Sequence, residues 1–220
     1  MPQAALDRDT SGPDYLPAGT VVRTASDPQL YLANGAAGAI PITTGNILSS
    51  YGLGLRIVTI SAASRAAMTV APGALGIAIT CGTDVFIAGG GTVWKVPDAG
   101  GLAPTSIDPT TCAGLPRSTK DVTGAVFLRN PNTSEVFIIS GGKKRLVTTT
   151  AELYSLNGIS PLVLIPATAE TLATIPNATV VLPVAKLVKA PSNPAVYLIE
   201  DSVPLRFRDV DSFGHVYHAE

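Results

Sequence analysis

The apolar positions between Val126 and Val147 fall into three short runs that are separated by turn-forming residues. The first run, VFLR, ends on a base and is followed by NPNTS, which is typical of a turn. The second run, EVFIIS, is rich in β-branched and aromatic residues, and Gly-Gly joins it to KKRLV, where basic and apolar residues alternate. The pattern predicts three short β-strands connected by tight turns.

The same three-strand pattern occurs four times along the chain, with an aromatic residue in each second strand. These aromatic residues are Tyr31, Phe86, Phe137 and Tyr197. A base lies eight positions before three of them, at Arg23, Arg129 and Lys189. Long sequence repeats are typical of proteins in which neighbouring units cover each other's apolar faces. We therefore expect four units, at roughly 17–71, 72–122, 123–182 and 183–220.

The fourth unit stops earlier than the others, and the start of the chain resembles what it lacks. Residues 15–22 (YLPAGTVV) echo residues 174–181 (TIPNATVV) near the end of the third unit. Two interpretations remain open. Either residues 1–16 complete the last unit and the two ends meet in a ring, or the chain is a stretch of a longer array.

Short helices are expected between the strands of consecutive units. One follows the third strand, in TGNILSSYG and TAELYSLNG, where glycine favours the C-terminal stop. An extended apolar piece, LRIVTI or PLVLIP, then leads to a second helix, with Ser61 or Thr168 as its N-cap. The second unit departs from this pattern, because residues 97–116 are too rich in Pro and Gly for a helix.

These elements predict one repeat domain over residues 1–220 that is mainly β with short helices. We expect four small antiparallel sheets in a pseudo-symmetric, β-propeller-like assembly. The aromatic residues of the second strands should face a common core, because one unit cannot bury its apolar face alone.

Cys81 and Cys112 are the two cysteines of the chain. Their spacing does not match that of metal ligands, which leaves a disulfide or two buried thiols. We prefer the disulfide, which would tie the first strand of the second unit to its helix-free loop. A disulfide, few charges and many Thr and Ser residues together favour an oxidising compartment outside the cytoplasm.

The charge balance excludes several classes of partner. Charged residues make up 14% of the chain, and 15 Lys and Arg nearly match 16 Asp and Glu. No basic excess points to nucleic acid or to an anionic membrane surface. No apolar run is long enough for a transmembrane helix, and the polar, acidic start does not resemble a signal peptide.

No group of residues in the sequence is typical of a catalytic site, so we expect a protein that is not an enzyme. The two histidines, His215 and His218, lie near the C-terminus, and no GxSxG motif is present. Together with Asp209, Asp211 and Glu220 they offer the ligand types of a metal site. A polar chain end is the preferred interpretation, so neither a metal nor a cofactor is expected.

Two groups of residues are candidates for ligand binding. Trp94 could stack on a sugar or anchor a peptide, although packing beneath the loop of its own unit is the preferred alternative. The recurring bases could form a positive rim for an acidic polymer such as teichoic acid or peptidoglycan, unless their stems only cover the edges of the core. This rim would contain Arg23, Lys143, Lys144, Arg145, Arg129, Lys189, Arg206 and Arg208.

The runs LVK and VYLI in residues 182–208, and the equivalent runs in 126–147, resemble a repeat module of about 55 residues. This module occurs in secreted actinobacterial proteins and is often attached to peptidoglycan hydrolases. A more distant resemblance is to the periplasmic repeat region of the B component of type VII secretion machines. That resemblance implies pseudo-symmetric repeats, a propeller-like core and a disulfide. Neither resemblance implies catalytic residues.

The sequence therefore predicts a non-catalytic binding or targeting domain that is secreted or lies in the cell envelope. Its partner would be a cell-wall polysaccharide or a protein. The alternative is a structural module that contacts other subunits of an envelope or secretion assembly.

Overall fold

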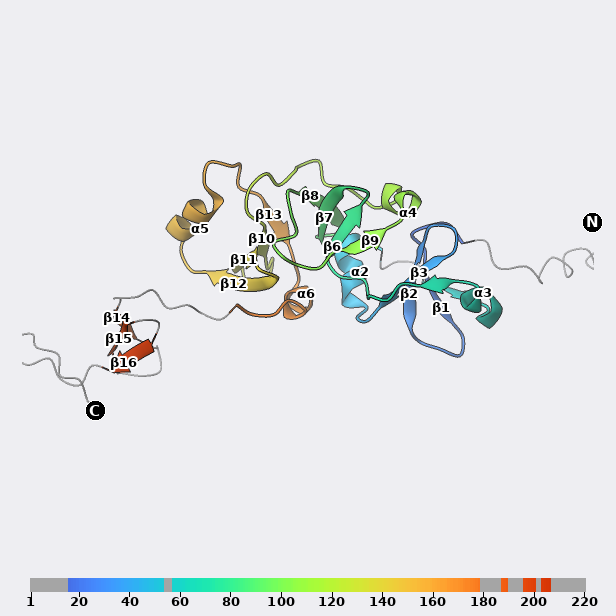
Figure 1. Cartoon of the computed structure of the whole chain (residues 1–220), viewed down its shortest axis with the longest axis horizontal. Coiled ribbons are helices and arrows are strands. Elements are labelled where there is room, and N and C mark those ends of the chain that lie inside the picture. The colour runs from blue at the N-terminus through green and yellow to red at the C-terminus, as the bar shows by residue number, and fades with distance from the viewer. Residues whose placement is uncertain (1–15, 54–56, 179–186, 190–195, 201–202, 207–220) are drawn as a thin grey trace, which may run out of the picture. The chain divides into compact units, whose positions relative to one another are not determined.

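A computed structural model describes residues 16–53, 57–178, 187–189, 196–200 and 203–206 (Figure 1). Contacts group the chain into two compact units, Met1–Asn177 and Ala178–Glu220. The described parts are mainly β with short helices, as predicted.

Three sheets form the unit Met1–Asn177. Across the first sheet, the strands follow the order β4 (Ile57–Ile60), β1 (Val21–Thr24), β2 (Leu30–Asn34), β3 (Gly38–Ile42) and β5 (Thr69–Val70). Across the second, the order is β8 (Thr92–Val96), β7 (Asp84–Gly89), β6 (Ala78–Cys81) and β9 (Thr105–Ile107). Across the third, it is β12 (Lys143–Val147), β11 (Val136–Ser140), β10 (Phe127–Arg129) and β13 (Leu164–Pro166).

The unit Ala178–Glu220 contains a three-stranded antiparallel sheet. Its strands are β14 (Leu187–Lys189), β15 (Val196–Glu200) and β16 (Val203–Arg206). The aromatic residue of the second strand pairs with the middle of the first strand in all four sheets. These pairs are Val22 with Tyr31, Ile79 with Phe86, Leu128 with Phe137, and Val188 with Tyr197.

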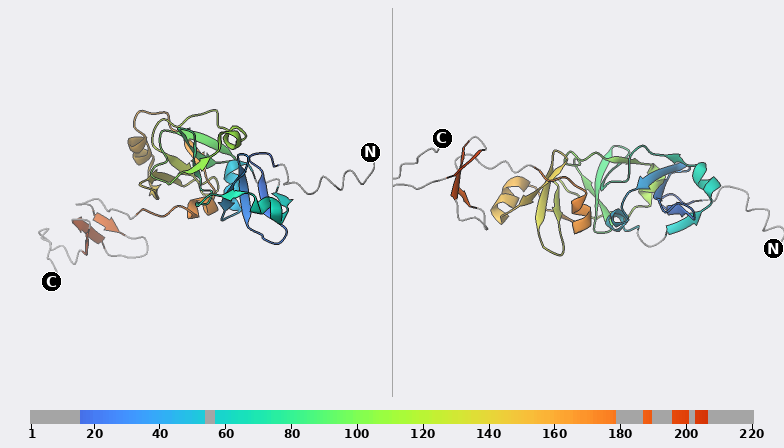
Figure 2. Two further views of the ribbon diagram at one scale, coloured as in Figure 1. Left: turned by 45° about the vertical axis from the view of Figure 1, so that its right-hand side comes forward. Right: turned by 90° about the horizontal axis from the view of Figure 1, so that it is seen from below.

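The prediction of purely antiparallel sheets is wrong for the first three sheets, because each contains a parallel strand. β4 runs parallel to β1, β9 to β6, and β13 to β10. Two of these strands, β4 and β13, lie within the predicted apolar pieces LRIVTI and PLVLIP, and each runs beside the first strand of its sheet in the same direction. A propeller-like assembly was expected, with closure of the ring left open, and the described residues contain no closed propeller. Within the described residues the second sheet lies between the first and the third, and the three form no ring (Figures 1 and 2).

The predicted helices are present where the sequence placed them. They are α2 (Asn46–Tyr51), α3 (Ala62–Ala66), α5 (Thr150–Asn157) and α6 (Ala169–Ala173). The side chains of Ser61 and Thr168 accept the backbone N–H groups of Ser64 and Thr171, as N-caps do. The second unit contains a helix that was not predicted, α4 (Pro109–Ala113). Asp108 caps this helix and Pro109 occupies its first turn, where proline needs no N–H partner.

A short helix carries the chain from one edge of each of these sheets to the other. α3 leads from β4 to β5, which runs parallel to β3. Single parallel bridges follow α4 and α6 in the same way, between Val93 and Arg117 and between Lys144 and Asn177. The segments before and after the helix therefore each add a parallel partner, one at either edge of the sheet.

Buried residues of the three sheets join in one hydrophobic core. Tyr51, Leu32 and Ile79 are among its largest fully buried side chains. The expectation that second-strand aromatics face this core holds for Phe86, which is 2% exposed. Phe137 is half-buried and also packs against this core. Tyr31 is half-buried, and the Arg65 guanidinium lies 4.0 Å from the centre of its ring. The division into four sequence units with the predicted boundaries stays a prediction.

Candidate binding surfaces

Helix α2 of the first sheet packs against β7 and β8 of the second sheet. Tyr51 is fully buried there, and its hydroxyl donates a hydrogen bond to the Gly76 carbonyl at 2.5 Å. Burial raises the pKa of Tyr51, because the charged phenolate would lose its hydration. At the end of the helix, the Gly91 N–H donates to the Ser50 carbonyl at 3.1 Å. A side chain at Gly52 would collide with the Gly91 carbonyl, so this close approach requires glycine.

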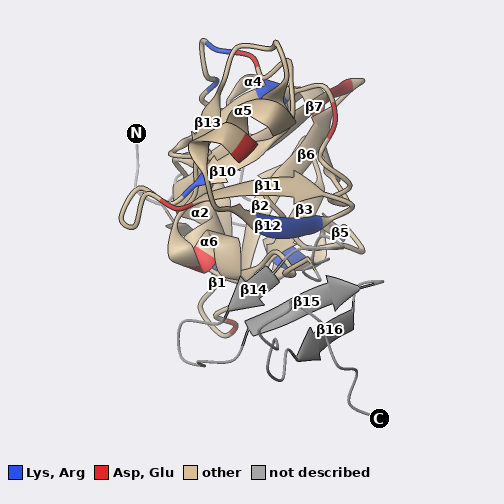
Figure 3. Cartoon of the chain, turned by 90° about the vertical axis from the view of Figure 1, so that its left-hand side faces the viewer, with Lys and Arg blue, Asp and Glu red and all other residues tan. Residues whose placement is uncertain are grey.

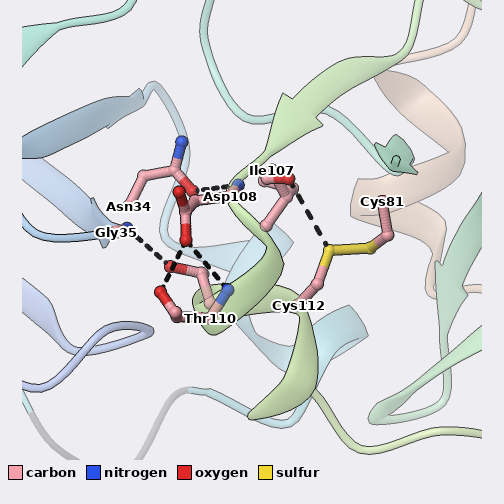
Figure 4. The surroundings of a disulfide bond; sticks show 8 residues. Asn34, Gly35, Cys81, Ile107, Asp108, Thr110 and Cys112 are labelled. Atoms are coloured by element: carbon pink, nitrogen blue, oxygen red, sulfur yellow. Dashed lines mark hydrogen bonds between the residues drawn. A yellow bond between two sulfur atoms is a disulfide. The ribbon is translucent and has the colours of Figure 1, made fainter. Parts of the chain in front are cut away.

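The turn between β2 and β3 makes the second half of this interface. The Asp108 N–H donates to the Asn34 side-chain oxygen at 2.7 Å, and the Gly35 N–H donates to the Thr111 hydroxyl at 2.9 Å (Figure 4). Hydrogen bonds from Thr110 lower the pKa of Asp108. The turn of the first sheet is therefore held at the N-terminal end of α4.

The disulfide joins Cys81 at the end of β6 to Cys112 on α4, with 6.0 Å between their Cα atoms (Figure 4). It anchors α4 to the second sheet, and α4 in turn holds the Asn34–Gly35 turn of the first sheet. The cross-link therefore stabilises both one sheet and the contact between two sheets.

A second interface, between the second and third sheets, is built in the same way. The Gly142 N–H in the β11–β12 turn donates to the Gly100 carbonyl at 2.9 Å. Gly100 lies in the loop that follows β8, just as α2 follows β3 in the first sheet. On the other side of this interface, the β7–β8 hairpin contacts the segment before α6. A side chain at Gly89, the last residue of β7, would meet the Pro166 carbonyl. At each interface, the segment that follows the third strand of one sheet contacts the hairpin of the next sheet. In addition, the hairpin turn of the first of these two sheets contacts the region of the short helix of the next sheet.

Apart from Val70 on β5, the exposed large apolar side chains of the described residues lie at two places. One, the β4 surface, consists of Ile57 and Val58 on β4, an edge strand of the first sheet, which are each about 40% exposed. The other, the α5 surface, consists of Leu146 on β12, Tyr154 and Leu156 on α5, and Ile159 just beyond it. Tyr154 is 58% exposed and Ile159 is completely exposed. An apolar patch of this kind typically marks an interaction site.

Helix α5 contrasts with α2, although both follow the third strand of their sheets. Four residues of α2 are buried, whereas only Asn157 of α5 is buried. A groove of about 390 Å³ lies beside the α5 surface, between the edges of β11 and β12 and the first turn of α5. This surface was not among the sites predicted from the sequence. The available signal was the helix TAELYSLN, whose apolar residues Leu153, Tyr154 and Leu156 are too widely spread around its axis for one buried face.

Trp94 lies on β8 and is half-buried. Its indole N–H donates to the Gly89 carbonyl at 3.0 Å, within its own hairpin, and its ring packs against the core. Its role as a ligand platform stays a prediction.

The recurring bases do not all face solvent. Lys144 donates to the carbonyls of Leu172 and Ile175 at the end of α6, at 2.7 and 2.6 Å, where a cation complements the helix dipole. Arg145 forms an ion pair with Glu152. In the described part of the chain, Arg23 and Lys143 are exposed and form no ion pair.

The remaining bases have weaker contacts or lie beyond what the structure describes. Arg129 donates to the Ser134 hydroxyl at 3.2 Å. Basic and acidic residues are distributed along the described parts of the chain, and β12 carries a run of three consecutive bases (Figure 3). Lys189 and Arg206 end β14 and β16, and their side chains are not described. Arg208 and the terminal candidates His215, His218, Asp209, Asp211 and Glu220 lie outside the described residues.

Glu152 fixes the start of α5. Thr149 caps the helix by accepting the Glu152 N–H, and the Glu152 carboxylate accepts the Thr148 N–H at 2.9 Å. The hydrogen bond from Arg145, assisted by that from Thr148, lowers the pKa of Glu152 to about 2. The pKa in the folded protein therefore lies below that of the unfolded chain, so the ionised carboxylate stabilises the fold above the unfolded pKa, and this contribution disappears as the pH falls towards 2.

Glu152→Gln is therefore expected to destabilise the protein at pH 7 by about 0.5–1 kcal/mol, the range of a partly exposed ion pair. The difference from the wild type should shrink below pH 4.5 and vanish near pH 2. Urea unfolding at several pH values measures it, with Glu135→Gln as a control at an exposed acid that forms no ion pair among the described residues. A difference that stays constant down to pH 2 would contradict this origin.

In the part of the chain that the structure describes, no helix is long and apolar enough to cross a membrane.

No protein-family model and no curated protein matches the chain. Among solved structures, it is similar to a chain of the periplasmic assembly from the ESX-5 inner membrane complex, with 11% sequence identity and a TM-score of 0.22. The alignment covers 84% of this chain and 64% of that chain, so this chain spans less than two thirds of its neighbour's length. The neighbour loosely echoes the type VII resemblance, but a likeness at this level supports no conclusion about fold or function, and no repeat family is shown.

Proposed function

We propose that this chain is a non-catalytic module that acts outside the cytoplasm by contacting a partner protein. The observation that supports this proposal best is the gathering of exposed apolar side chains on the β4 and α5 surfaces. The Cys81–Cys112 disulfide supports a secreted or envelope location, because disulfides persist in oxidising compartments. That the module is not an enzyme rests on the sequence alone.

The four-unit repeat belongs to the same proposal. Its support is the common register of the first two strands in the four sheets, with an aromatic residue at the same paired position. Units of this kind expose apolar surface at any end that no neighbour covers. A module that joins other proteins through such ends fits an envelope or secretion assembly.

Site-specific photo-cross-linking in the cell envelope of the source organism tests the contact with a protein. A photoreactive amino acid at position 154 or 58 should give defined cross-linked products, because these positions lie within the two apolar surfaces. The same group at position 120, where Lys120 is exposed outside both surfaces, is the matched control. Equal labelling at all three positions, or none at positions 154 and 58, would contradict the proposal.

A cell-wall polymer is the second candidate partner, supported by the exposed side chains of Arg23 and Lys143, which form no ion pair with described residues. Sedimentation with purified peptidoglycan, with and without its anionic polymers, tests this candidate at low and high salt. Binding through these bases should be lost at high salt and reduced by Arg23→Gln with Lys143→Gln, but not by Lys120→Gln. Failure to sediment at low salt would exclude it.

A further inference from the structure

The two residues of the Cys81–Cys112 disulfide lie in different surroundings. Cys81 is the last residue of β6 and is half-buried, and the two residues that follow it, Gly82 and Thr83, are exposed. Cys112 lies on α4, is 2% exposed and belongs to the hydrophobic core. A thiolate can open a disulfide only at a sulfur that it can reach. The more exposed position therefore favours attack at Cys81.

The third sheet holds the equivalent helix without a disulfide. Thr111 in α4 and Thr171 in α6 each stand three residues after the N-cap, and both are fully buried. The residue after this threonine is Cys112 in α4 but Leu172 in α6, where it is 4% exposed. An apolar side chain therefore suffices to seat the helix in α6. What the disulfide adds in the second sheet is a covalent bond that a reductant can open.

Opening this bond should affect α4 more than β6. Strand β6 pairs with both β7 and β9, and these pairings do not involve the disulfide. Helix α4 has only five residues, and it holds the first sheet through few contacts. The Thr111 hydroxyl accepts the Gly35 N–H at 2.9 Å and donates to the Ala33 carbonyl at 3.3 Å. A short element with few contacts opens locally at the lowest free energy.

We infer that the disulfide is a redox-sensitive site at which a dithiol exchanges with Cys81, and that its opening releases the β2–β3 turn from α4. A thiolate of the dithiol attacks Sγ of Cys81, and the electron pair of the broken S–S bond leaves on Sγ of Cys112. The second thiol of the dithiol then attacks the mixed disulfide and frees Cys81. The dithiol is thereby oxidised to a disulfide, and its two electrons and two protons end on the two cysteines.

The site is prepared for the reduced state. Sγ of Cys112 lies 3.9 Å from the Ile107 carbonyl, so a thiol formed there has a hydrogen-bond acceptor within the core (Figure 4). The inference does not depend on which partner the chain contacts, so its failure would leave the proposed function untouched.

A brief reaction of the oxidised full chain with glutathione tests the point of attack. Acid stops the exchange, and mass spectrometry locates the mixed disulfides. In the folded protein, glutathione should be found on Cys81 about tenfold more often than on Cys112, or more. The same reaction in urea is the matched control, and there the preference should disappear. Equal distribution in the folded protein, a preference for Cys112, or no reaction before unfolding would overturn the inference.

Hydrogen exchange tests the release of the turn. Exchange at the Gly35 amide should accelerate about tenfold or more on reduction with dithiothreitol and recover after reoxidation. Thr111→Val removes the hydroxyl that accepts this N–H, so the amide should exchange rapidly even in the oxidised protein, and reduction should add little. Thr171→Val, the equivalent change in α6, is the control that should keep the response to reduction. Circular dichroism verifies folding, and a wild type whose Gly35 exchange ignores reduction would overturn the inference by itself.

Discussion

Replacing Tyr51 by alanine should lower the free energy of unfolding by about 3–5 kcal/mol, as removing a large aromatic side chain from a core does. Tyr51 is fully buried where α2 meets β7 and β8, so the cavity would open between two sheets. Urea unfolding of the purified protein measures the change. Tyr154→Ala is the matched control, because Tyr154 is 58% exposed and its truncation should change stability by no more than about 0.5 kcal/mol.

Tyr51→Phe separates the hydrogen bond from the packing. It keeps the ring but removes the hydroxyl that donates to the Gly76 carbonyl, so the expected loss is about 1–2 kcal/mol. Burial raises the pKa of Tyr51 above that of an unfolded tyrosine, so stability from this group is complete below pH 10 and falls as the pH rises beyond it. Tyr51→Phe should weaken this alkaline dependence, and equal losses from Phe and Ala would contradict the packing argument.

Reducing the Cys81–Cys112 disulfide should lower the free energy of unfolding by about 2–4 kcal/mol, because the cross-link restricts the unfolded chain. Urea unfolding with and without a reductant measures this loss. The double variant Cys81→Ala and Cys112→Ala should be destabilised by a similar amount and should not respond to the reductant. A wild type whose urea midpoint is unchanged by complete reduction would contradict the prediction.

Loss of the disulfide should also increase local opening of the structure around α4. α4 holds the β2–β3 turn of the first sheet through the Asp108 N–H and the Thr111 hydroxyl. Hydrogen exchange at the Asp108 and Gly35 amides should therefore accelerate on reduction more than exchange at the Ile139 amide, which lies in the third sheet. Equal acceleration at all three amides would indicate global rather than local opening.

The hairpins could be predicted from the sequence because their signals are local. Alternating apolar residues around Phe137 and the glycines at 141 and 142 lie within one short stretch, and turn chemistry sets the pairing. The parallel strands could not be predicted in the same way. Ile57–Ile60 is recognisable as extended, but its pairing with β1 depends on a contact between residues more than thirty positions apart. Helix α4 was not predicted because Pro and Gly usually interrupt a helix, whereas Pro109 stands in the first turn after a capping aspartate.

The candidate site was predicted less well, because exposure depends on neighbours that the sequence does not identify. Lys144 and Arg145 have the same charge as Lys143 and stand beside it. Lys144 binds a carbonyl at the end of α6, Arg145 pairs with Glu152, and only Lys143 is exposed. In the same way, the apolar residues of TGNILSSYG and TAELYSLNG look alike in sequence. Only the packing of α2 on the second sheet distinguishes the buried helix from the exposed one.

Each of the three sheets takes all its strands from one uninterrupted stretch of chain, within residues 21–70, 78–107 and 127–166. Strand pairing of this kind keeps the sequence separation of contacts small, which favours rapid folding. A chain that emerges from a translocation pore with its N-terminus first can complete one sheet before the next has appeared. The two cysteines also lie within the second sheet's own stretch and the helix that follows it, so the thiols meet before any of the third sheet is needed. Folding order and oxidation would then follow the order of emergence.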